Sequence, residues 1–204
     1  MKSAIFNFGR FNPPTKGHLR LIITTKHNAI DGQSDYFLFP SRSVDKIPMT
    51  KPLEPSKCKN PLSFTTKYAF LTELLPLVNI VDNASVVSPH QVIDYLSELG
   101  YEDVTFAVGT DRVEEFNRRW LPYAEQVFVK AFVAEAAPRD NSNRVSRMSG
   151  TKARSAALDG NLEYFQTVTG WHNNFGVRLY NAVRTGMGLD GRTRQSIQGE
   201  IIGG

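Results

Sequence analysis

The sequence has only one cysteine, Cys58, and it has no long run of apolar residues. A single cysteine excludes a disulfide within the chain and excludes a cysteine cage for a structural metal. No segment approaches the roughly 20 apolar residues of a membrane-spanning helix. The first residues, 1–6, lack the apolar region and cleavage site of a signal peptide, and they predict a strand instead. We therefore expect a soluble, cytoplasmic protein with no membrane partner.

An excess of charge of one sign is also missing. The chain has 24 Lys and Arg against 20 Asp and Glu, a formal net charge of +4. The basic residues gather in two segments that are predicted to be loops, one from Arg42 to Lys59 and one from Arg139 to Arg154. Such clusters either meet an anionic ligand or face solvent. No aromatic residues interleave with a basic stripe, so nucleic acid is not the expected anion.

Ligand sets for metals and for hydrolysis are absent as well. His27, His90 and His172 are scattered without metal-ligand spacing, and no carboxylate pair suited to hydrolysis is recognisable. We interpret Trp120 and Trp171 as packing residues. Nothing in the sequence indicates a haem, flavin or zinc site.

The chain of 204 residues, 41% hydrophobic, is long enough for one domain with a substantial core. We predict a domain over residues 1–170, followed by a C-terminal helix and a flexible tail over residues 171–204. Hydrophobic periodicity and breakers predict strands at 4–8, 36–39, 79–82, 104–108 and 127–132. They predict helices at 16–29, 63–75, 89–99, 111–119, 151–158, 162–167 and 173–184. Thr110 or Asp111 is the expected cap of the fourth helix.

Strands separated by helical segments predict a parallel sheet, because parallel neighbours need crossover connections. Right-handed crossovers then give a doubly wound, Rossmann-like α/β fold, here with a helical C-terminal region. Such sheets bind ligands at the carboxyl ends of their strands, where the strand order reverses. The loop over residues 41–61, rich in Pro and Lys, follows the second strand and is long enough to be a functional loop.

The segment from Gly9 to His18 joins the first strand to the first helix, where backbone N–H groups and the positive helix end bind phosphate. Gly9 lets the backbone approach a ligand, Thr15 can cap the helix, and Gly17 leaves the first turn uncovered. His18 can donate hydrogen bonds to phosphate oxygens and, when protonated, can offset developing negative charge. The alternative is a capped helix start with an incidental histidine.

A second segment opens a helix after the last predicted strand. Ser149 and Thr151 offer hydroxyl groups there, and Lys152 and Arg154 offer cations. Arg154 lies one turn into the helix and can form a bidentate fork on phosphate. Alone, this pattern is also typical of an ordinary capped helix. Its value comes from pairing with the first segment at the same predicted sheet edge.

Three segments together resemble the nucleotidylyltransferase superfamily. Residues 9–18 are similar to its (H/T)-x-G-H signature, residues 148–154 to its I-S-S-T-x-x-R signature in the form S-G-T-x-x-R, and residues 108–111 to its G-x-D element. The residues in these signatures resemble most those of the nicotinamide-mononucleotide adenylyltransferase-like branch, and within it those of bacteriophage-encoded nucleotidyltransferase-like proteins. Met148 and Gly150 depart from the usual Ile and Ser. The loop over 41–61 and the tail after Thr185 lie outside the resemblance.

The resemblance implies that an acceptor phosphate attacks the α-phosphate of a nucleoside triphosphate and releases pyrophosphate. No general base is needed, so positioning and charge stabilisation carry the reaction. The first expectation is AMP transfer from ATP to a small phosphorylated acceptor such as nicotinamide mononucleotide. Transfer from CTP to a phosphorylated alcohol or sugar stays open. Mg²⁺ is expected to be carried mainly by the triphosphate, with no protein ligands of its own.

The resemblance also implies roles for individual residues. Thr15 and His18 would bind the triphosphate and stabilise the transition state. Ser149, Thr151 and Arg154 would hold the β- and γ-phosphates, and Asp111 would contact the nucleoside or the acceptor. The expected catalytic residues are His18, Thr15 and Arg154. The expected nucleotide-binding residues are Gly9, Arg10, Phe11, Lys16, Gly17, Gly109, Asp111, Ser149, Gly150, Thr151 and Lys152.

A function of a different class is the alternative: a catalytically weak or inactive protein that kept the fold and took a structural or partner-binding role. The Pro-rich loop and the Gly-rich tail are what a docking protein would add. A second copy of the chain or a virion protein would then be the partner, bound through the tail. The location would be the cytoplasm of a bacterial host or a phage particle. The intact residues of both signatures argue against a dead site.

Overall fold

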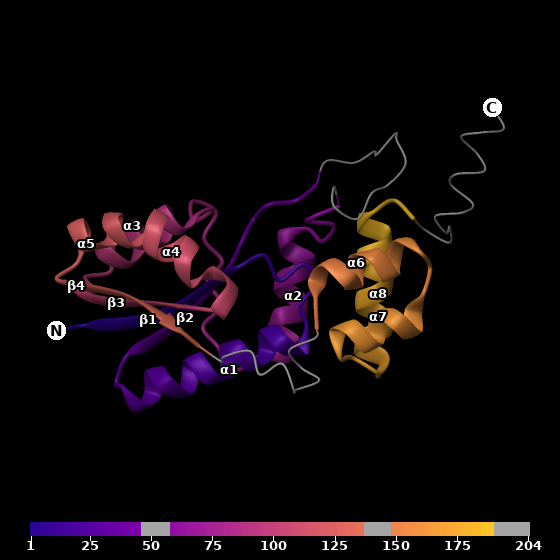
Figure 1. Cartoon of the computed structure of the whole chain (residues 1–204), viewed down its shortest axis with the longest axis horizontal. Helices are drawn as coiled ribbons and strands as arrows, with labels where there is room; N and C mark the ends of the chain where they lie inside the picture. Colours follow the sequence, from indigo (N-terminus) through magenta and orange to yellow (C-terminus); the bar gives the residue numbers. More distant parts are fainter. Residues whose placement is uncertain (46–57, 137–147, 190–204) are drawn as a thin grey trace. The chain divides into compact units, whose positions relative to one another are not determined.

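The computed structural model describes residues 1–45, 58–136 and 148–189. In these residues, one parallel sheet has the strand order β2-β1-β3-β4 (Figure 1). The strands are β1 (Ser3–Gly9), β2 (Asp35–Pro40), β3 (Asp103–Val108) and β4 (Lys130–Glu135). β1 therefore lies at the centre, with β2 on one side and β3 on the other, and the strand order reverses there. This is the predicted doubly wound α/β class.

Helices cover both faces of the sheet, which explains why β1, β2 and β3 bury side chains on both faces. The helix α1 (Lys16–Asp31) runs along one face. The helices α3 (Pro89–Glu98), α4 (Val113–Arg119) and α5 (Leu121–Val127) run along the other (Figure 1). Phe6 of β1 lies at the centre of the core and contacts the Phe106 ring at a centroid distance of 4.8 Å. On the opposite side of β1, the buried Asn7 side chain donates hydrogen bonds to Thr25 Oγ1 of α1 and to Ala107 O of β3. These contacts fix α1 and β3 against β1.

The remaining helices match their predicted positions to within a few residues. They are α2 (Phe64–Leu74), α3 (Pro89–Glu98), α6 (Gly150–Leu158), α7 (Leu162–Thr169) and α8 (Asn174–Gly186). No helix in the described ranges is both long and apolar enough to cross a membrane.

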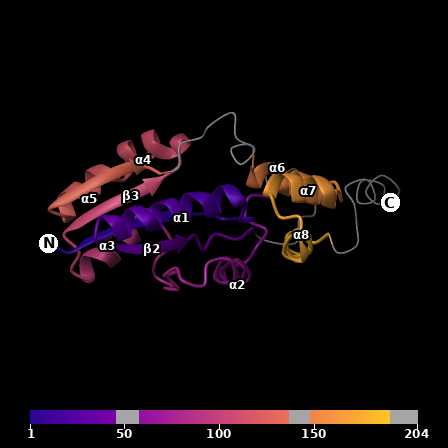
Figure 2. The same ribbon diagram turned by 90° about the horizontal axis from the view of Figure 1, so that it is seen from below.

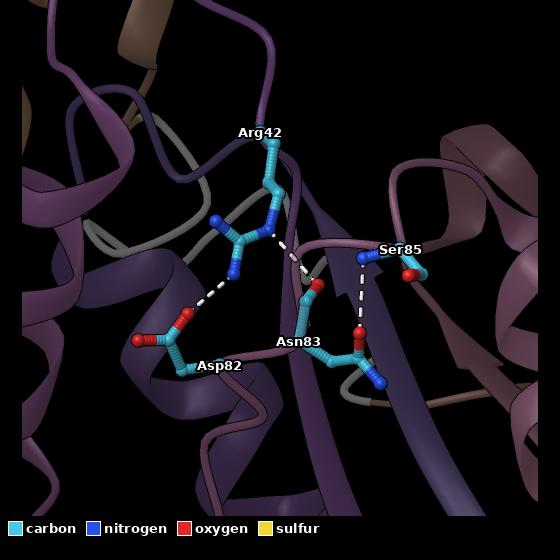
Figure 3. A network of polar contacts seen from close by, with 4 residues as sticks. All are labelled: Arg42, Asp82, Asn83 and Ser85. Atoms are coloured by element: carbon cyan, nitrogen blue, oxygen red, sulfur yellow. Dashed lines mark hydrogen bonds and ion pairs between the residues drawn. The ribbon is translucent and has the colours of Figure 1, made fainter.

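The strand predicted at 79–82 is wrong. Only Ile80 forms a bridge, with Leu38 of β2. The chain leaves β2 after Val81, and Arg42 contacts the following two residues, Asp82 and Asn83 (Figure 3). Its Nη2 atom forms an ion pair with Asp82, and its Nε atom donates a hydrogen bond to Asn83 O. In the described residues, this segment pairs with β2 only through that one bridge.

Two further predictions need correction. The strand predicted at 127–132 begins only at Lys130, because Val127 ends a short helix, α5 (Leu121–Val127), which the sequence did not predict. The helix predicted at 111–119 begins with a 3₁₀ turn over Thr110–Arg112, and α4 covers Val113–Arg119. Neither Thr110 nor Asp111 caps it, since the N-cap positions are Gly109 and Arg112.

The described residues form two compact units that are interleaved in sequence. The first, over 1–9, 18–42 and 71–136, contains the sheet. The second, over 10–17, 43–45, 58–70 and 148–189, contains α6, α7 and α8, which lie side by side in both views (Figures 1 and 2). In this unit Phe165 of α7 packs on Tyr180 of α8, and Arg184 donates a hydrogen bond to Ala157 O of α6. The predicted division at residue 170 stays a prediction.

Candidate functional site

The second unit brings the two predicted phosphate-binding segments into contact. Arg154 of α6 donates a hydrogen bond of 2.8 Å from Nη1 to Asn12 O, although the two residues are 142 positions apart. A Cβ atom built on Gly150 would lie 3.4 Å from Arg154 Nη1 and 3.7 Å from Pro13 O. The start of α6 therefore packs directly against the loop over residues 10–17.

The start of α6 is shaped as an anion-binding helix end. Ser149 is the N-cap, with extended backbone, and its hydroxyl accepts a hydrogen bond from Lys152 N. Its own N–H donates to Val168 O at the end of α7. Thr151 and Lys152 are exposed in the first turn. The first N–H groups of a helix have no partner within the helix, so this turn can receive an anion.

Arg154 is buried, with 6% of its surface exposed. Burial lowers the pKa of its guanidinium, the nearby Arg10 lowers it further, and Asp45 and Cys58 oppose the shift. An arginine nevertheless remains charged in proteins. Its Nη2 atom donates to Thr151 Oγ1, but its Nε atom is buried and has no hydrogen-bond partner among the described residues. A buried cation with an unused donor is the strongest indication of an anion site in this unit.

The loop over residues 10–17 is anchored from several directions. The Asn12 side chain donates to Leu62 O and accepts from Leu62 N, at 3.1 and 3.0 Å. Phe11 is buried and adopts a left-handed backbone conformation with φ 44°, which costs a non-glycine residue about 1–2 kcal/mol. The Trp171 indole donates from Nε1 to Pro14 O at 3.2 Å. These contacts hold the loop in one conformation.

Thr15, Lys16 and Arg10 differ in their exposure. Thr15 is buried, while Lys16 and Arg10 are exposed. The Lys16 ammonium lies 5.5 Å from the centroid of the Trp171 ring. Gly17 continues into α1 and is partly exposed.

Cys58 lies near Arg154 but is not suited to act as a nucleophile. It is fully buried, and burial raises the pKa of its thiol, as does the Asp45 carboxylate, while Arg154 opposes the shift. Asp45 accepts a hydrogen bond from Asn60 N at 2.7 Å. We interpret Cys58 as a neutral thiol that packs beneath the site.

The other predicted site residues belong to the first unit. Gly9 ends β1 and its carbonyl accepts a hydrogen bond from Ser41 N. His18 is partly exposed in the first turn of α1. Gly109 follows β3, and a Cβ atom there would lie 3.0 Å from Asp111 Oδ1. Asp111 itself is exposed within the 3₁₀ turn.

The donor set in the second unit suits an anion. It consists of hydroxyl groups, helix N–H groups and cations. In the described part of the chain, no group of three or more His, Cys, Asp or Glu side chains could hold a metal ion. Of the two basic clusters noted in the sequence, Arg42, Lys59, Lys152 and Arg154 lie in the described ranges. Lys46, Lys51, Lys57, Arg139, Arg144 and Arg147 lie outside them.

Sequence reasoning missed two residues of this arrangement. Asn12 stood inside the first segment but was given no role, and Trp171 was interpreted only as a packing residue. Both act through hydrogen bonds that join distant parts of the chain. The one signal for Asn12 was an amide side chain beside two prolines, a setting in which side chains often bond to backbone.

Comparisons place the fold among solved structures, although no model of a protein family and no curated protein matches the sequence. A structure from Vibrio parahaemolyticus, assigned as a nicotinate-nucleotide adenylyltransferase, is 20% identical with a TM-score of 0.54, and the match covers 89% of this chain and 100% of that one. Nicotinic acid mononucleotide adenylyltransferase from Plasmodium falciparum, complexed with NaAD, is 13% identical with a TM-score of 0.54, covering 90% and 98%. The structure of the same Plasmodium falciparum enzyme complexed with APC is 12% identical with a TM-score of 0.52, and the match covers 89% of this chain and 98% of that one. The chain thus has the Rossmann-type α/β fold of these nucleotidyltransferases.

Proposed function

We propose that this protein is a nucleotidyltransferase that moves AMP from ATP to a small phosphorylated acceptor, such as nicotinamide mononucleotide, and releases pyrophosphate. The observation that carries the proposal is the buried Arg154 guanidinium with its unused Nε donor, held between the start of α6 and the loop over residues 10–17. The fold it shares with adenylyltransferase structures supports the same reaction class.

The chemistry needs positioned positive charge more than acid–base groups. An oxygen of the acceptor phosphate attacks the α-phosphorus, the bond from that phosphorus to the bridging oxygen breaks, and pyrophosphate leaves with the electron pair. The start of α6 receives the β- and γ-phosphates through Ser149, Thr151 and Arg154, and Lys152 adds charge at the exposed side. Thr15 and His18, on the loop and first turn of α1, act on the charge that develops during transfer.

The remaining assigned residues shape the loop and the nucleotide contacts. Gly9, Phe11, Gly17 and Gly150 keep the backbone close to the ligand, and Arg10 and Lys16 supply exposed cations. Gly109 and Asp111 would contact the nucleoside or the acceptor.

The residues of this site fit Mg²⁺ only when the triphosphate itself coordinates the ion. Hydroxyl groups, helix N–H groups and cations are poor metal ligands but good phosphate ligands. Mg²⁺ bound to the phosphates would offset their charge while this chain orients them.

Thermal unfolding with Mg²⁺ and each common nucleoside triphosphate tests the proposal without knowledge of the acceptor. A ligand that binds only the folded state, at about 100 times its Kd, stabilises that state by about 2.7 kcal/mol. We expect ATP, or failing that CTP, to raise the Tm of the wild type, and we expect a smaller rise for His18→Ala. His27→Ala is the matched control, because His27 is exposed on the same helix two turns away. The His27→Ala protein should show the same rise in Tm as the wild type.

Pyrophosphate release with candidate phosphorylated acceptors then tests turnover. Release with one acceptor identifies the reaction. A protein that binds ATP but releases no pyrophosphate with any of them would favour the structural or partner-binding alternative. If no triphosphate at millimolar concentration stabilises the wild type, the enzyme proposal is abandoned.

A further inference from the structure

Trp171 contacts the loop over residues 10–17 with both its polar edge and its ring face. Its Nε1 atom donates to Pro14 O at 3.2 Å, and the Lys16 ammonium lies 5.5 Å from the ring centroid. The side chain is only 7% exposed, and its ring packs on Phe175 at a centroid distance of 5.0 Å. The packing therefore fixes the indole in place, and from this fixed position it contacts Pro14 O and the Lys16 ammonium.

The backbone that leads to Trp171 is equally constrained. Gly170 ends α7 in the left-handed conformation with φ +82°, which favours glycine. A Cβ atom there would lie 2.6 Å from Met148 Cε and 2.9 Å from Lys16 Cδ. Met148 directly precedes the N-cap of α6, so one residue from each phosphate-binding segment meets at Gly170. Gly170 thus lies against a side chain from each of the two segments.

The hydrogen bond to Pro14 fixes more than one carbonyl group. Because a trans peptide unit is planar, holding Pro14 O also sets the plane that contains the Thr15 N–H. Thr15 is buried and is the predicted first residue of the signature that contacts phosphate. Loss of the indole N–H would free this peptide plane to rotate.

The contact with Lys16 orients a cation without neutralising it. An aromatic face attracts an ammonium group, but it carries no net charge. In the described part of the chain, no ion pair involves Lys16. Among these residues no carboxylate neutralises the charge that the indole ring attracts.

We propose that Trp171 is a positioning residue of the nucleotide site: it fixes the Pro14–Thr15 peptide plane and aims the Lys16 ammonium at the triphosphate. The proposal rests on the proposed function and adds to it a cation whose direction depends on a residue outside both signatures. Trp171 does not itself touch the nucleotide.

Trp171→Phe tests this role, because phenylalanine keeps a ring but loses the N–H donor and part of the attraction for a cation. We expect the Kd of MgATP to rise about fivefold to tenfold, the effect of about 1 kcal/mol. The kcat should also fall, because a freed Pro14–Thr15 peptide plane leaves Thr15, which acts on the charge that develops during transfer, less well placed. Trp120→Phe in the first unit is the matched control and should leave the Kd unchanged.

A double-mutant cycle with Lys16→Met separates positioning from packing. In the wild-type background Lys16→Met should weaken MgATP binding by about threefold or more, whereas in the Trp171→Phe background it should have a smaller effect. Equal effects in both backgrounds would mean that Trp171 does not aim Lys16.

Tryptophan fluorescence gives a readout that does not depend on a variant at position 171. The chain has two tryptophans, so the Trp120→Phe protein reports Trp171 alone. MgATP and inorganic tripolyphosphate should both change its emission, because the phosphates draw the Lys16 ammonium. Adding Lys16→Met should remove most of this change. In the Trp171→Phe protein, which reports Trp120 alone, emission should not respond.

The outcomes separate this inference from the proposed function. If MgATP raises the Tm of the Trp120→Phe protein but leaves Trp171 emission and the Trp171→Phe affinity unchanged, Trp171 only packs and the inference is overturned. The proposed function then stands. If no triphosphate stabilises the wild type, both the proposed function and the inference about Trp171 are wrong. Should Trp171→Phe fail to fold, the fluorescence of the Trp120→Phe protein decides.

Discussion

At the scale of single residues, Arg154 links the structure to the proposed chemistry. Its two terminal nitrogens hold Asn12 O and Thr151 Oγ1, while Nε stays buried without a partner among the described residues. A guanidinium can serve both purposes because its five N–H donors point in fixed directions. The same side chain therefore ties the loop to α6 and keeps donor capacity for a phosphate.

Arg154→Lys should damage both roles even though it conserves the charge. A lysine ammonium cannot reach two acceptors in this fork geometry, and Asn12 O would lose its buried donor. We expect the free energy of unfolding to fall by about 1–3 kcal/mol and the Kd of MgATP to rise about tenfold or more. Urea unfolding and isothermal titration measure the two effects.

Lys152→Met is the control for Arg154→Lys. Lys152 is exposed two residues earlier on α6, so its loss removes charge without breaking a buried contact. Its effect on unfolding should stay within about 0.5 kcal/mol. An Arg154→Lys protein that binds MgATP like the wild type would contradict the role given to the guanidinium fork.

The residues that sequence could indicate are those whose chemistry is local. Their role can be inferred from about ten neighbouring residues in the sequence. Examples are the glycine, threonine and histidine at a strand–helix junction, and the arginine one turn into a helix. Asn12 and Trp171 differ, because they act on Leu62 O and Pro14 O, which are 50 and 157 residues away in sequence. No periodicity or spacing encodes such contacts, so only the folded chain reveals them.

At the scale of elements, burial explains which predictions held. The strands β1, β2 and β3 are apolar runs with both faces covered, and the sequence predicted them to within one residue at each end. The strand at 79–82 failed because Arg42 holds the backbone after a single bridge. The start of β4 was misplaced because Val127 and Phe128 look like strand residues although Val127 completes a short helix. Local residue preferences alone could not distinguish a strand from a turn at 79–82, or a strand from a helix at 127–128.

Two helix ends offer a matched pair for testing the junction at Gly170. Gly100 follows α3 with φ +77°, and a Cβ atom there would meet nothing within 4 Å, whereas Gly170 has φ +82° and close neighbours. Alanine at either position should cost about 1 kcal/mol for the left-handed backbone. Only Gly170→Ala should also raise the Kd of MgATP, by about threefold or more, because Met148 and Lys16 must move. Equal Kd values for the two variants would show that this junction does not set the site.

At the scale of the whole molecule, the chain crosses between its two compact units several times. The loop over residues 10–17 belongs to the second unit although it lies between β1 and the rest of α1 in the first. The interleaving depends on long-range contacts within a unit, such as that of Arg154 with Asn12, which the order of the chain does not encode. The predicted division at residue 170 stays a prediction.

Alkaline pH should weaken the whole fold through its buried tyrosines. Burial raises the pKa of Tyr36 above its ordinary value, and its hydroxyl donates a hydrogen bond to Asn7 Oδ1 at 2.5 Å. Burial and the Asp35 carboxylate, which accepts a hydrogen bond from the Tyr101 hydroxyl, raise the pKa of Tyr101 in the same direction. The folded state therefore keeps these protons after the unfolded state releases them at about pH 10. The stabilisation is complete below that pH, and each tyrosine removes about 1.4 kcal/mol per pH unit above it.

Tyr36→Phe separates this titration from packing. Near pH 8 the variant should be less stable than the wild type by about 1–3 kcal/mol, because Asn7 Oδ1 loses its buried donor. Above about pH 10 the gap should narrow by about 1.4 kcal/mol per pH unit, since the variant has one fewer proton to retain. Phe37→Leu, at the next buried position of β2, has no titratable group, so its deficit should stay constant with pH. Urea unfolding at a series of pH values measures all three proteins. A Tyr36→Phe gap that does not change with pH would mean that the folded and unfolded states release the Tyr36 proton together.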